Sequence, residues 1–160
     1  MKTAYIAFDD LDLTKFESDD VSDWNNYKQS FEKDICFVAD SISIDAIEKK
    51  NMDFYNFKFK SCVLSNIKFY RCNFKDCVFE NCHFDHCILK SCTFDGSIFN
   101  KCFFSYTDVT RSTFSGCEII SCSDKGLWGD GTEFDNVRVL TPSTIHTSKY
   151  SRFKNFFKGK

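Results

Sequence analysis

Large apolar residues recur at every fifth position through the middle of the chain. All fourteen members of this central series are large and apolar. They are Phe54, Phe59, Leu64, Phe69, Phe74, Phe79, Phe84, Leu89, Phe94, Phe99, Phe104, Val109, Phe114 and Ile119. A second series, two residues before each of these, runs from Met52 to Cys122 and contains nine of the ten cysteines. A repeat of this length has to be interpreted before any single motif, because it decides the fold.

A period of five fits neither a helix, which repeats at about 3.6 residues, nor a flat strand, which repeats at 2. Two inward positions separated by one outward residue make a short strand, and a turn must follow each strand. Four such units close a square coil of twenty residues, and successive coils stack at about 4.8 Å. The pattern predicts an all-β solenoid, a parallel β-helix whose two ends need covering elements.

The coil length also predicts which inward side chains stack on one another. The four expected ladders are Phe54, Phe74, Phe94, Phe114 and Phe134; Phe59, Phe79, Phe99, Ile119 and Val139; Leu64, Phe84 and Phe104; and Phe69, Leu89 and Val109. Offset stacking of the rings adds to the free energy of burying them. These residues are expected to build the scaffold and to take no part in chemistry.

Three units show the order small, polar, Leu or Phe, polar, any: Cys72-Asn-Phe-Lys-Asp76, Cys82-His-Phe-Asp-His86 and Cys92-Thr-Phe-Asp-Gly96. In these units the stretch 52–122 resembles the pentapeptide repeat family, and the resemblance extends with lapses over 37–140. It implies a right-handed quadrilateral β-helix. The chain prefers Phe to Leu and Cys to Ala, so its interior is expected to be unusually bulky.

The chain divides into an N-terminal segment (1–36), a repeat body (37–140) and a C-terminal tail (141–160). Residues 3–16 are expected to form a first strand and part of a first coil. Within 17–34, Trp24, Tyr27 and Phe31 have helical spacing, and Ser22 or Asp23 could cap the helix. This acidic helix is expected to lie over the open end of the body. The two series begin early, with Phe37 and Ala39, then Ile42 and Ile44, then Ile47, and the central series breaks at Lys49.

Composition argues for a soluble protein of a reducing cytoplasm, with reduced thiols. The cysteines occupy small positions of a repeat with a Phe-rich core, whereas secreted disulfide scaffolds are usually short and rich in loops. No apolar stretch near Met1 is long enough for a signal peptide. No window approaches the roughly 20 apolar residues that span a bilayer.

The sequence contains no pattern typical of a catalytic or metal site. In the run Cys82-His83-Phe84-Asp85-His86-Cys87, the cysteines point inward and the histidines outward, so they cannot converge on zinc. There is no Cys-x-x-Cys pair, Gly-rich phosphate loop or nucleophile elbow. We therefore expect no enzyme activity, no metal, no cofactor and no small-molecule substrate.

The residue before each central position points outward, and these residues form four walls. Wall 1 has Asp53, Asn73, Thr93, Thr113 and Glu133; wall 2 has Lys58, Val78, Ile98, Glu118 and Arg138; wall 3 has Val63, His83, Phe103 and Ser123; wall 4 has Lys68, Ile88, Asp108 and Trp128. Walls 2 and 3 carry an apolar stripe (Val63, Val78, Ile98, Phe103). Such a stripe indicates an interface, or it is covered by the acidic helix of 17–34; both interpretations are open.

Residues 123–131 contain three glycines and lack apolar central residues at Asp124 and Gly129. We expect a loop here that projects from the solenoid. Pentapeptide repeat proteins that protect DNA gyrase from quinolones carry functional loops of this kind. By that resemblance, Trp128 is the leading candidate for a partner contact, together with Lys125 and Asp130. In the alternative interpretation, Trp128 folds back to close the last coil.

Charge is distributed unevenly, with −6 over residues 1–50, −1 over 51–140 and +5 over 141–160. Within the tail, the basic residues of 149–160 alternate with Tyr150, Phe153, Phe156 and Phe157. The tail could contact an anionic membrane or nucleic acid, or it could cap the last coil. The cap is the preferred interpretation because a solenoid end must be covered.

Three functions remain open at this point. The first is a non-enzymatic scaffold whose stripe and Trp128 loop bind another protein or a second copy of the chain as a homodimer. The second is the gyrase-binding DNA mimicry that the resemblance implies, but it needs an acidic surface and the body carries only −1. The third is a bacterial secreted effector that contacts membranes through residues 149–160. Nucleic acid is not the expected partner.

Overall fold

A computed structural model describes residues 4–140 of the chain. The N-terminal segment contains strand β1 (Tyr5–Ala7), the 3-10 helix η1 (Phe8–Asp10), and helices α1 (Leu13–Glu17) and α2 (Val21–Gln29). Short strands follow to the end of the described part. They are β2 (Cys36–Asp40), β3 (Ser43–Asp45), β4 (Glu48–Lys50), β5 (Phe57–Lys60), β6 (Val63–Ser65), β7 (Lys68–Tyr70), β8 (Val78–Glu80), β9 (His83–Asp85), β10 (Ile88–Lys90), β11 (Ile98–Asn100), β12 (Phe103–Asp108), β13 (Glu118–Ile120), β14 (Ser123–Trp128) and β15 (Arg138–Leu140).

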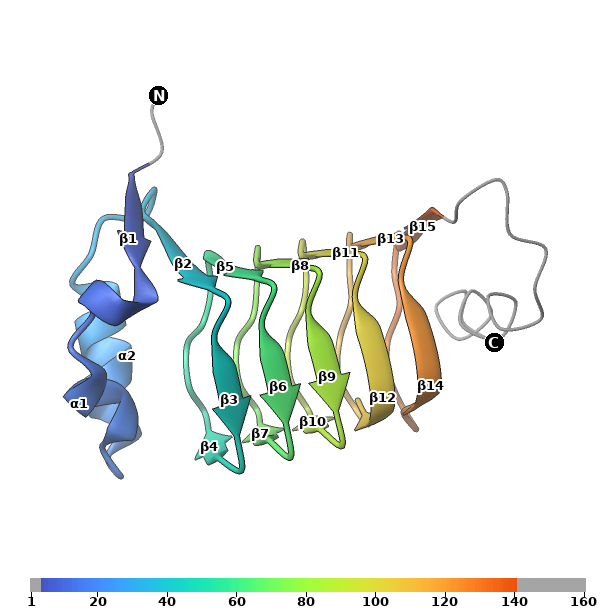
Figure 1. Ribbon diagram of the computed structural model, residues 1–160, viewed down its shortest axis with the longest axis horizontal. Coiled ribbons are helices and arrows are strands. Elements are labelled where there is room, and N and C mark those ends of the chain that lie inside the picture. Colours follow the sequence, from blue (N-terminus) through green and yellow to red (C-terminus); the bar gives the residue numbers. More distant parts are fainter. Residues whose placement is uncertain (1–3, 141–160) are drawn as a thin grey trace.

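The strands stack as parallel ladders along one axis (Figure 1). One sheet has the order β1-β2-β5-β8-β11-β13-β15, and the other has the order β3-β6-β9-β12-β10-β7-β4, with β14 added beside β12. Partners are twenty residues apart, as in Phe79 with Phe99 and Leu64 with Phe84. Wall 1 continues the same register through bridges from Asp53 to Glu133. The predicted quadrilateral β-helix is confirmed.

The corners of the coil depend on left-handed backbone geometry. From Ser41 to Asn136, every fifth residue has a positive φ. Most of these positions hold Asn, Ser, Asp or Gly, which adopt that region most readily. A few hold bulky side chains, including Tyr106 at φ 47° and Arg71 at φ 53°. The corner position therefore explains the recurrence of small and amide residues two places after each central residue.

The central residues form the predicted interior ladders. Stacked ring centroids lie between 4.8 Å (Phe79 and Phe99) and 5.6 Å (Phe114 and Phe134) apart. In the neighbouring ladder, Phe84 stacks on Phe104 at 4.9 Å. The spacing is close to that of paired strands, so the coil repeat itself sets the ring separation.

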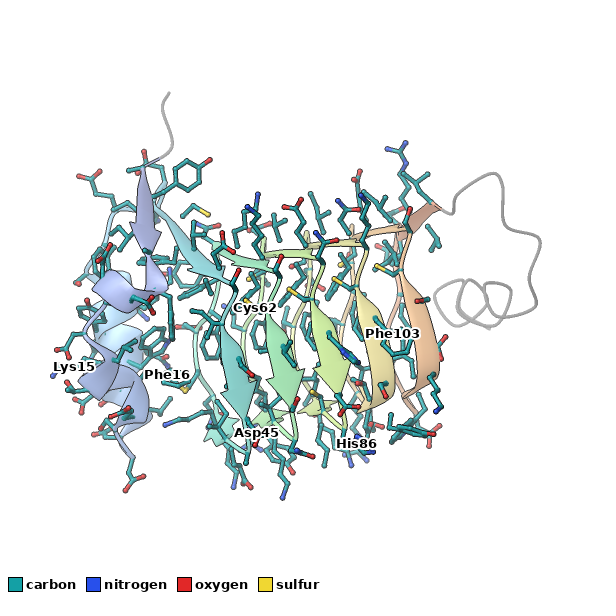
Figure 2. The ribbon with its side chains drawn as sticks, viewed as in Figure 1. Lys15, Phe16, Asp45, Cys62, His86 and Phe103 are labelled. Carbon is teal, nitrogen blue, oxygen red and sulfur yellow. The ribbon has the colours of Figure 1, made fainter. Side chains whose placement is uncertain are left out.

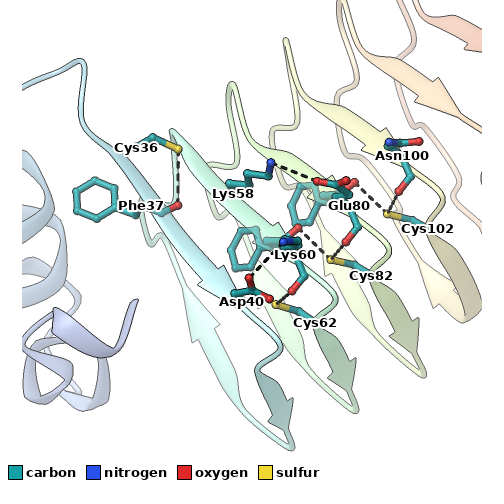
Figure 3. Close-up of polar contacts among 12 residues, drawn as sticks. Cys36, Phe37, Asp40, Lys58, Lys60, Cys62, Glu80, Cys82, Asn100 and Cys102 are labelled. Atoms are coloured by element: carbon teal, nitrogen blue, oxygen red, sulfur yellow. Dashed lines mark hydrogen bonds and ion pairs between the residues drawn. The ribbon is translucent and has the colours of Figure 1, made fainter. Parts of the chain in front are cut away.

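The cysteines of the second series also act as hydrogen-bond donors. Cys82 Sγ donates to the carbonyl oxygens of Phe59 at 3.3 Å and Glu80 at 3.5 Å, and the same contacts recur along the column (Figure 3). At equivalent positions the hydroxyl of Ser97 donates to Phe74 O at 2.6 Å. Burial raises the pKa of the Cys87 and Cys117 thiols to about 12. Cys87 and Cys117 thus remain protonated and donate to carbonyl oxygens of the preceding coil, those of Leu64 and Phe94.

Helix α2 covers the first coil, as expected for the acidic helix. Trp24 is fully buried, and its ring lies 5.8 Å from that of Phe54. Its Nε1 donates to Asp53 O at 2.7 Å. The N-cap is Asp20, whose carboxylate accepts from Ser22 N at 2.9 Å, so the expectation of Ser22 or Asp23 was wrong. Asp20 lies two residues before Ser22, and its carboxylate accepts from a free backbone N–H of the first helical turn.

Residues 3–16 form less of a coil than expected. Among those described, only Tyr5–Ala7 form a strand, and η1 and α1 follow. Asp12 caps α1 by accepting from Thr14 N at 3.2 Å. Phe16 then packs against Trp24, with ring centroids 5.5 Å apart. The apolar spacing at five was misleading here because these side chains cover the end of the body and do not line it.

The break at Lys49 has a local explanation. Lys49 pairs with Phe69 in the strand register and occupies the inward position of the first coil. Its Nζ reaches Ser18 O at 3.5 Å and lies 5.1 Å from the Phe16 ring. A charged group is tolerated there because its alkyl chain follows the open end of the solenoid toward solvent.

The loop expected at 123–131 is contradicted. Residues 123–128 form β14, which pairs with β12 along its whole length, from Phe103 with Ser123 to Asp108 with Trp128. Gly126 takes a corner at φ 98°, and Asp124 Oδ1 accepts from the N–H groups of Gly126 and Leu127. Leu127, in the second series that holds only Cys, Ser or Thr from Cys72 to Cys122, is buried. It fills part of the interior that the central series leaves empty at Asp124 and Gly129.

The predicted basic tail at 141–160 lies outside the described residues. In the part that is described, no helix is long and apolar enough to cross a membrane.

Truncating a ladder residue should destabilise the whole stack. We expect Phe79→Ala to lower the free energy of unfolding by roughly 3 to 5 kcal/mol, because it leaves a cavity between two stacked rings. Urea denaturation measures this value. Phe79→Leu is the matched control and should cost much less, since Leu64 and Leu89 occupy equivalent positions. Equal losses for the two variants would contradict the ladder interpretation.

Lys28 of α2 is an unusual buried cation. It is 2% exposed, and its Nζ lies 4.0 Å from the centre of the Phe37 ring and 3.7 Å from that of Tyr55. None of the ion pairs found within residues 4–140 includes it. Desolvation lowers the pKa of Lys28 to about 8. The two rings offset part of the cost of burying the charge.

This burial predicts a pH dependence of stability. Unfolded lysine has a pKa of about 10.4, so above pH 8 the unfolded state binds more protons than the folded one. The contribution of Lys28 to the free energy of unfolding should therefore rise with pH, by up to about 3 kcal/mol by pH 10. The buried thiols, whose pKa burial raises, act in the opposite direction above about pH 8.5, but they do so equally in the wild type and in a Lys28 variant. Lys28→Met should remove that rise and leave the fold stable at pH 7. Urea titrations between pH 7 and 9.5 test this, and equal slopes for both proteins would refute it.

Candidate functional site

Wall 1 is the flat polar surface that the repeat predicts. Its bridging residues lie one coil apart in an unbroken series. On this wall Asn73 Nδ2 donates to Asp53 Oδ1 at 3.2 Å, which ties neighbouring coils together at the surface. Wall 1 therefore offers hydrogen-bonding groups and no apolar contact.

The apolar stripe lies on two walls that meet at a corner. Val78 and Ile98 pair in β8 and β11 on wall 2, and Val63 and Phe103 lie in β6 and β12 on wall 3. Val63 is 40% exposed, and the other three side chains are half-buried. The polar corner residues separate the two pairs, so the stripe is two neighbouring patches and not one surface.

His83 divides the wall 3 patch. It pairs with Val63 in the coil before it and with Phe103 in the coil after it, and the rings of His83 and Phe103 lie 5.0 Å apart. Its Nε2 is buried and has no hydrogen-bond partner within residues 4–140. A buried polar atom without a partner costs free energy. Because this atom is shielded, Val63 and Phe103 are the side chains of the patch that a partner can contact directly.

The N-terminal helices do not cover this patch. The contacts of α2 are with the end of the first coil, where Asn25 Nδ2 donates to Asn51 O at 2.9 Å and Trp24 meets Phe54. Val63, on the first repeat of wall 3, keeps its exposure. The interpretation in which the acidic helix covers the stripe is therefore wrong for Val63.

The three residues expected on a loop lie instead on and just after β14. Trp128 points outward on wall 4 and is 46% exposed, so it does not fold back to close the last coil. Lys125 Nζ lies 5.6 Å from the centre of the Tyr106 ring. Asp130 is exposed, and its N–H donates to Thr110 Oγ1 at 3.4 Å. The structure thus does not bring these residues together with the apolar stripe.

Two aromatic side chains at the corner of walls 3 and 4, Tyr106 and His86, were not among the residues that the sequence predicted as contacts. Tyr106 is 43% exposed, and its ring lies 5.0 Å from that of His86 in the coil before it. Gly126 lies against Tyr106 in the coil after it, where a Cβ would approach the ring to 3.3 Å. Both aromatics occupy left-handed corners. An aromatic residue where the repeat otherwise has Asn, Ser or Gly was the signal available in the sequence.

Charge is segregated by wall, although the body is nearly neutral. Wall 1 and its following corner carry five carboxylates and one lysine: Asp53, Asp76, Asp95, Glu133, Asp135 and Lys75. Wall 4 and its following corner carry five cations and three carboxylates: Lys50, Lys68, Arg71, Lys90, Arg111, Glu48, Asp108 and Asp130. The net charges are −4 and +2. The net charge of −1 over residues 51–140 does not reveal this segregation, because the opposite charges of different walls cancel.

The histidines and carboxylates of wall 3 do not form a metal centre. His86 Nδ1 contacts Asp85 Oδ1 at 3.0 Å, on the outside of the coil (Figure 2). No group of three or more His, Cys, Asp or Glu side chains suited to a metal ion occurs in the described part of the chain.

These features define a class of protein: a four-walled parallel β-solenoid with a filled interior and only its outer surface free for contacts. A family model described as a pentapeptide repeat region matches residues 52–127. We therefore assign this region to the pentapeptide repeat family, in agreement with the resemblance in the sequence. A search of curated proteins gives no match.

Two solved structures show the same fold. The chain is similar to QnrB1, described as a plasmid-mediated fluoroquinolone resistance protein, with a TM-score of 0.57 and 20% identity over 69% of this chain and 52% of that one. It thus spans about half the length of QnrB1. It is also similar to Rfr23, a pentapeptide repeat protein of the cyanobacterium Cyanothece 51142, with a TM-score of 0.52 and 10% identity over 74% of this chain and 97% of that one.

Proposed function

We propose that this chain is a non-enzymatic, cytoplasmic scaffold that binds another protein through wall 3 of the solenoid. The observation that carries the proposal is the wall 3 patch, where exposed Val63 and half-buried Phe103 flank His83, whose Nε2 is buried without a partner in the described part. A flat β-wall with apolar side chains and one unsatisfied polar atom fits a protein surface better than a small molecule. A second copy of the chain is one candidate partner.

The wall 2 pair adds a second contact for a partner that wraps the corner. Beside Val78 and Ile98, Lys58 Nζ pairs with Glu80 at 3.2 Å. Such an ion pair at the rim contributes little free energy but restricts which partners fit. Trp128 and Tyr106 form a separate aromatic surface and are the next candidates for a contact.

Affinity pull-down with quantitative mass spectrometry tests the scaffold proposal. Phe103→Ser should reduce recovery of the partner at least about tenfold, because an aromatic anchor at an interface contributes about 2 kcal/mol or more. Trp128→Ala tests the aromatic surface in the same way. Thr93→Ser on wall 1 is the matched control and should recover the partner as the wild type does.

Sedimentation velocity of the purified protein separates the two kinds of partner. A dimer that dissociates in the Phe103→Ser variant would identify a second copy as the partner. A monomer in both, together with a pull-down partner that the variant loses, would identify another protein. Identical recovery by wild type and Phe103→Ser would overturn the assignment to wall 3.

A second candidate is a DNA-mimicking protein that binds gyrase or a related topoisomerase. The acidic wall 1, with its net charge of −4, supports it, because such mimicry needs a negative stripe along the rod. Similarity in fold to a fluoroquinolone resistance protein also supports it. Two observations count against this candidate. Wall 4 is basic, and the similarity to QnrB1 covers only 52% of that chain.

Gyrase supercoiling assays with and without ciprofloxacin test this second candidate. The wild type should change supercoiling at micromolar concentration, and Glu133→Lys combined with Asp135→Lys should abolish the effect by reversing charge on wall 1. Asp45→Lys combined with Asp85→Lys makes a matched double charge reversal on wall 3 and should leave the effect intact. No effect of the wild-type protein would eliminate the mimic.

The membrane-contacting effector rests on residues 149–160, outside the described part. It has no support from the walls of the solenoid, and neither do nucleic-acid, cofactor or small-molecule partners.

A further inference from the structure

The N-terminal end of the solenoid presents four strand edges, and two of them are covered. Strand β1 pairs with β2, and Cys36 N donates to Ala4 O at 3.0 Å. On wall 1, side chains of α2 take the place of a strand. Trp24 Nε1 donates to Asp53 O at 2.7 Å, and Asn25 Oδ1 accepts from Asp53 N at 2.9 Å.

The edges of β3 and β4 are not covered in this way. They are the two terminal strands of the eight-stranded sheet, and no strand pairs with their outer edges within residues 4–140 (Figure 1). Lys68 N donates to Ile47 O, and Asn51 N donates to Tyr70 O. The backbone N–H and C=O groups of the odd-numbered residues in this segment therefore point toward β7. Alternation then directs the N–H and C=O groups of Glu48 and Lys50 away from the sheet.

A hollow lies beside the β4 edge. It has a volume of about 350 Å³ and is lined by Ser18, Asp19 and Val21 on the N-terminal side and by 48–52 on the coil. A second hollow of about 310 Å³ shares Glu48 and Lys50 and extends along Tyr70 and Arg71. The free backbone groups of β4 therefore adjoin space that a short extended segment can enter.

Two of the three cations around this space, Lys49 and Arg71, have no carboxylate partner within residues 4–140. Lys49 Nζ has one polar contact, with Ser18 O at 3.5 Å. Arg71 Nε donates to Asn51 Oδ1 at 2.9 Å, which orients the guanidinium beside the hollow. Neither side chain takes part in an ion pair within the described residues. Lys50, by contrast, is already paired with Glu48 at 3.1 Å.

Unpaired backbone groups and unpaired cations at one place favour one kind of ligand. A free strand edge binds extended peptide by adding a strand to the sheet, and the cations favour carboxylates in that peptide. We propose that the outer edge of β4 is a strand-addition site for an extended acidic segment of a partner protein. Its backbone pairs with Glu48 and Lys50, and its carboxylates contact Lys49 and Arg71.

This site is separate from the wall 3 patch, so each proposal stands or fails alone. Strand addition also explains an asymmetry of the N-terminal segment. That segment supplies a strand for β2 and side-chain hydrogen bonds for Asp53, yet it leaves the edges of β3 and β4 without either.

Fluorescence anisotropy with two labelled hexapeptides tests the site on the full-length protein. The probe is Asp-Val-Asp-Val-Asp-Val, and the comparison peptide replaces each Asp by Lys. We expect only the acidic peptide to bind. Lys49→Met and Arg71→Gln should each weaken binding at least fivefold, and Lys68→Met, a lysine on the next coil outside both hollows, should not. Thermal melting followed by circular dichroism checks that each variant is folded.

Amide hydrogen exchange by NMR distinguishes strand addition from charge attraction. In the free protein the amides of Glu48 and Lys50 should exchange fast, and that of Lys49 slowly. The acidic peptide should slow exchange at Glu48 and Lys50 at least tenfold. An acidic peptide with N-methylated backbone should lose this protection and most of its affinity. Equal binding of the methylated peptide, equal binding of the lysine peptide, or no binding at millimolar peptide would each overturn the proposal.

Discussion

The stacking of coils at a register of twenty residues is the constraint on which the rest of the structure depends. Each coil hydrogen-bonds its neighbours through nearly every backbone group of its walls, and the square it encloses must be filled completely. The central residues meet this requirement by stacking along the axis, as Phe79 and Phe99 do at 4.8 Å. Because offset rings stack with a centroid separation close to the strand spacing, one side chain per coil in each ladder satisfies both packing and pairing.

The twenty-residue register also limits which residue types fit at the other positions of the repeat. Cys, Ser or Thr in the second series donates to a carbonyl of the preceding coil, as Cys82 and Ser97 show, so a small side chain with a donor fits better than a purely apolar one. The residue at each corner takes a left-handed conformation. What remains free is one outward residue per unit, and function is confined to those residues, to a few corners and to the two ends.

The strand edges at the N-terminal end differ in whether their backbone groups are hydrogen-bonded, and the walls differ in the side chains that they carry. Trp24 and Asn25 take up the backbone groups of Asp53, whereas β4 keeps an open edge next to unpaired cations. On the walls, carboxylates collect on wall 1 and cations on wall 4, and the apolar side chains of wall 3 surround the buried Nε2 of His83. The rod therefore has a different chemistry on each side, which suits a protein that recognises partners by its surface.

The sequence by itself determined the architecture, the four ladders and the face of each outward side chain, because a strict period leaves only one register. It was wrong about 123–131, since Asp124 and Gly129 looked like interruptions, and only the pairing of β14 with β12 shows Leu127 filling the interior instead. It also placed the helix cap two or three residues late. Exposure, the division of the stripe between two walls, the segregation of charge and the open edge of β4 were decided by the tertiary structure. Each of these depends on which coil lies beside which, and on where the N-terminal segment turns away from the stack.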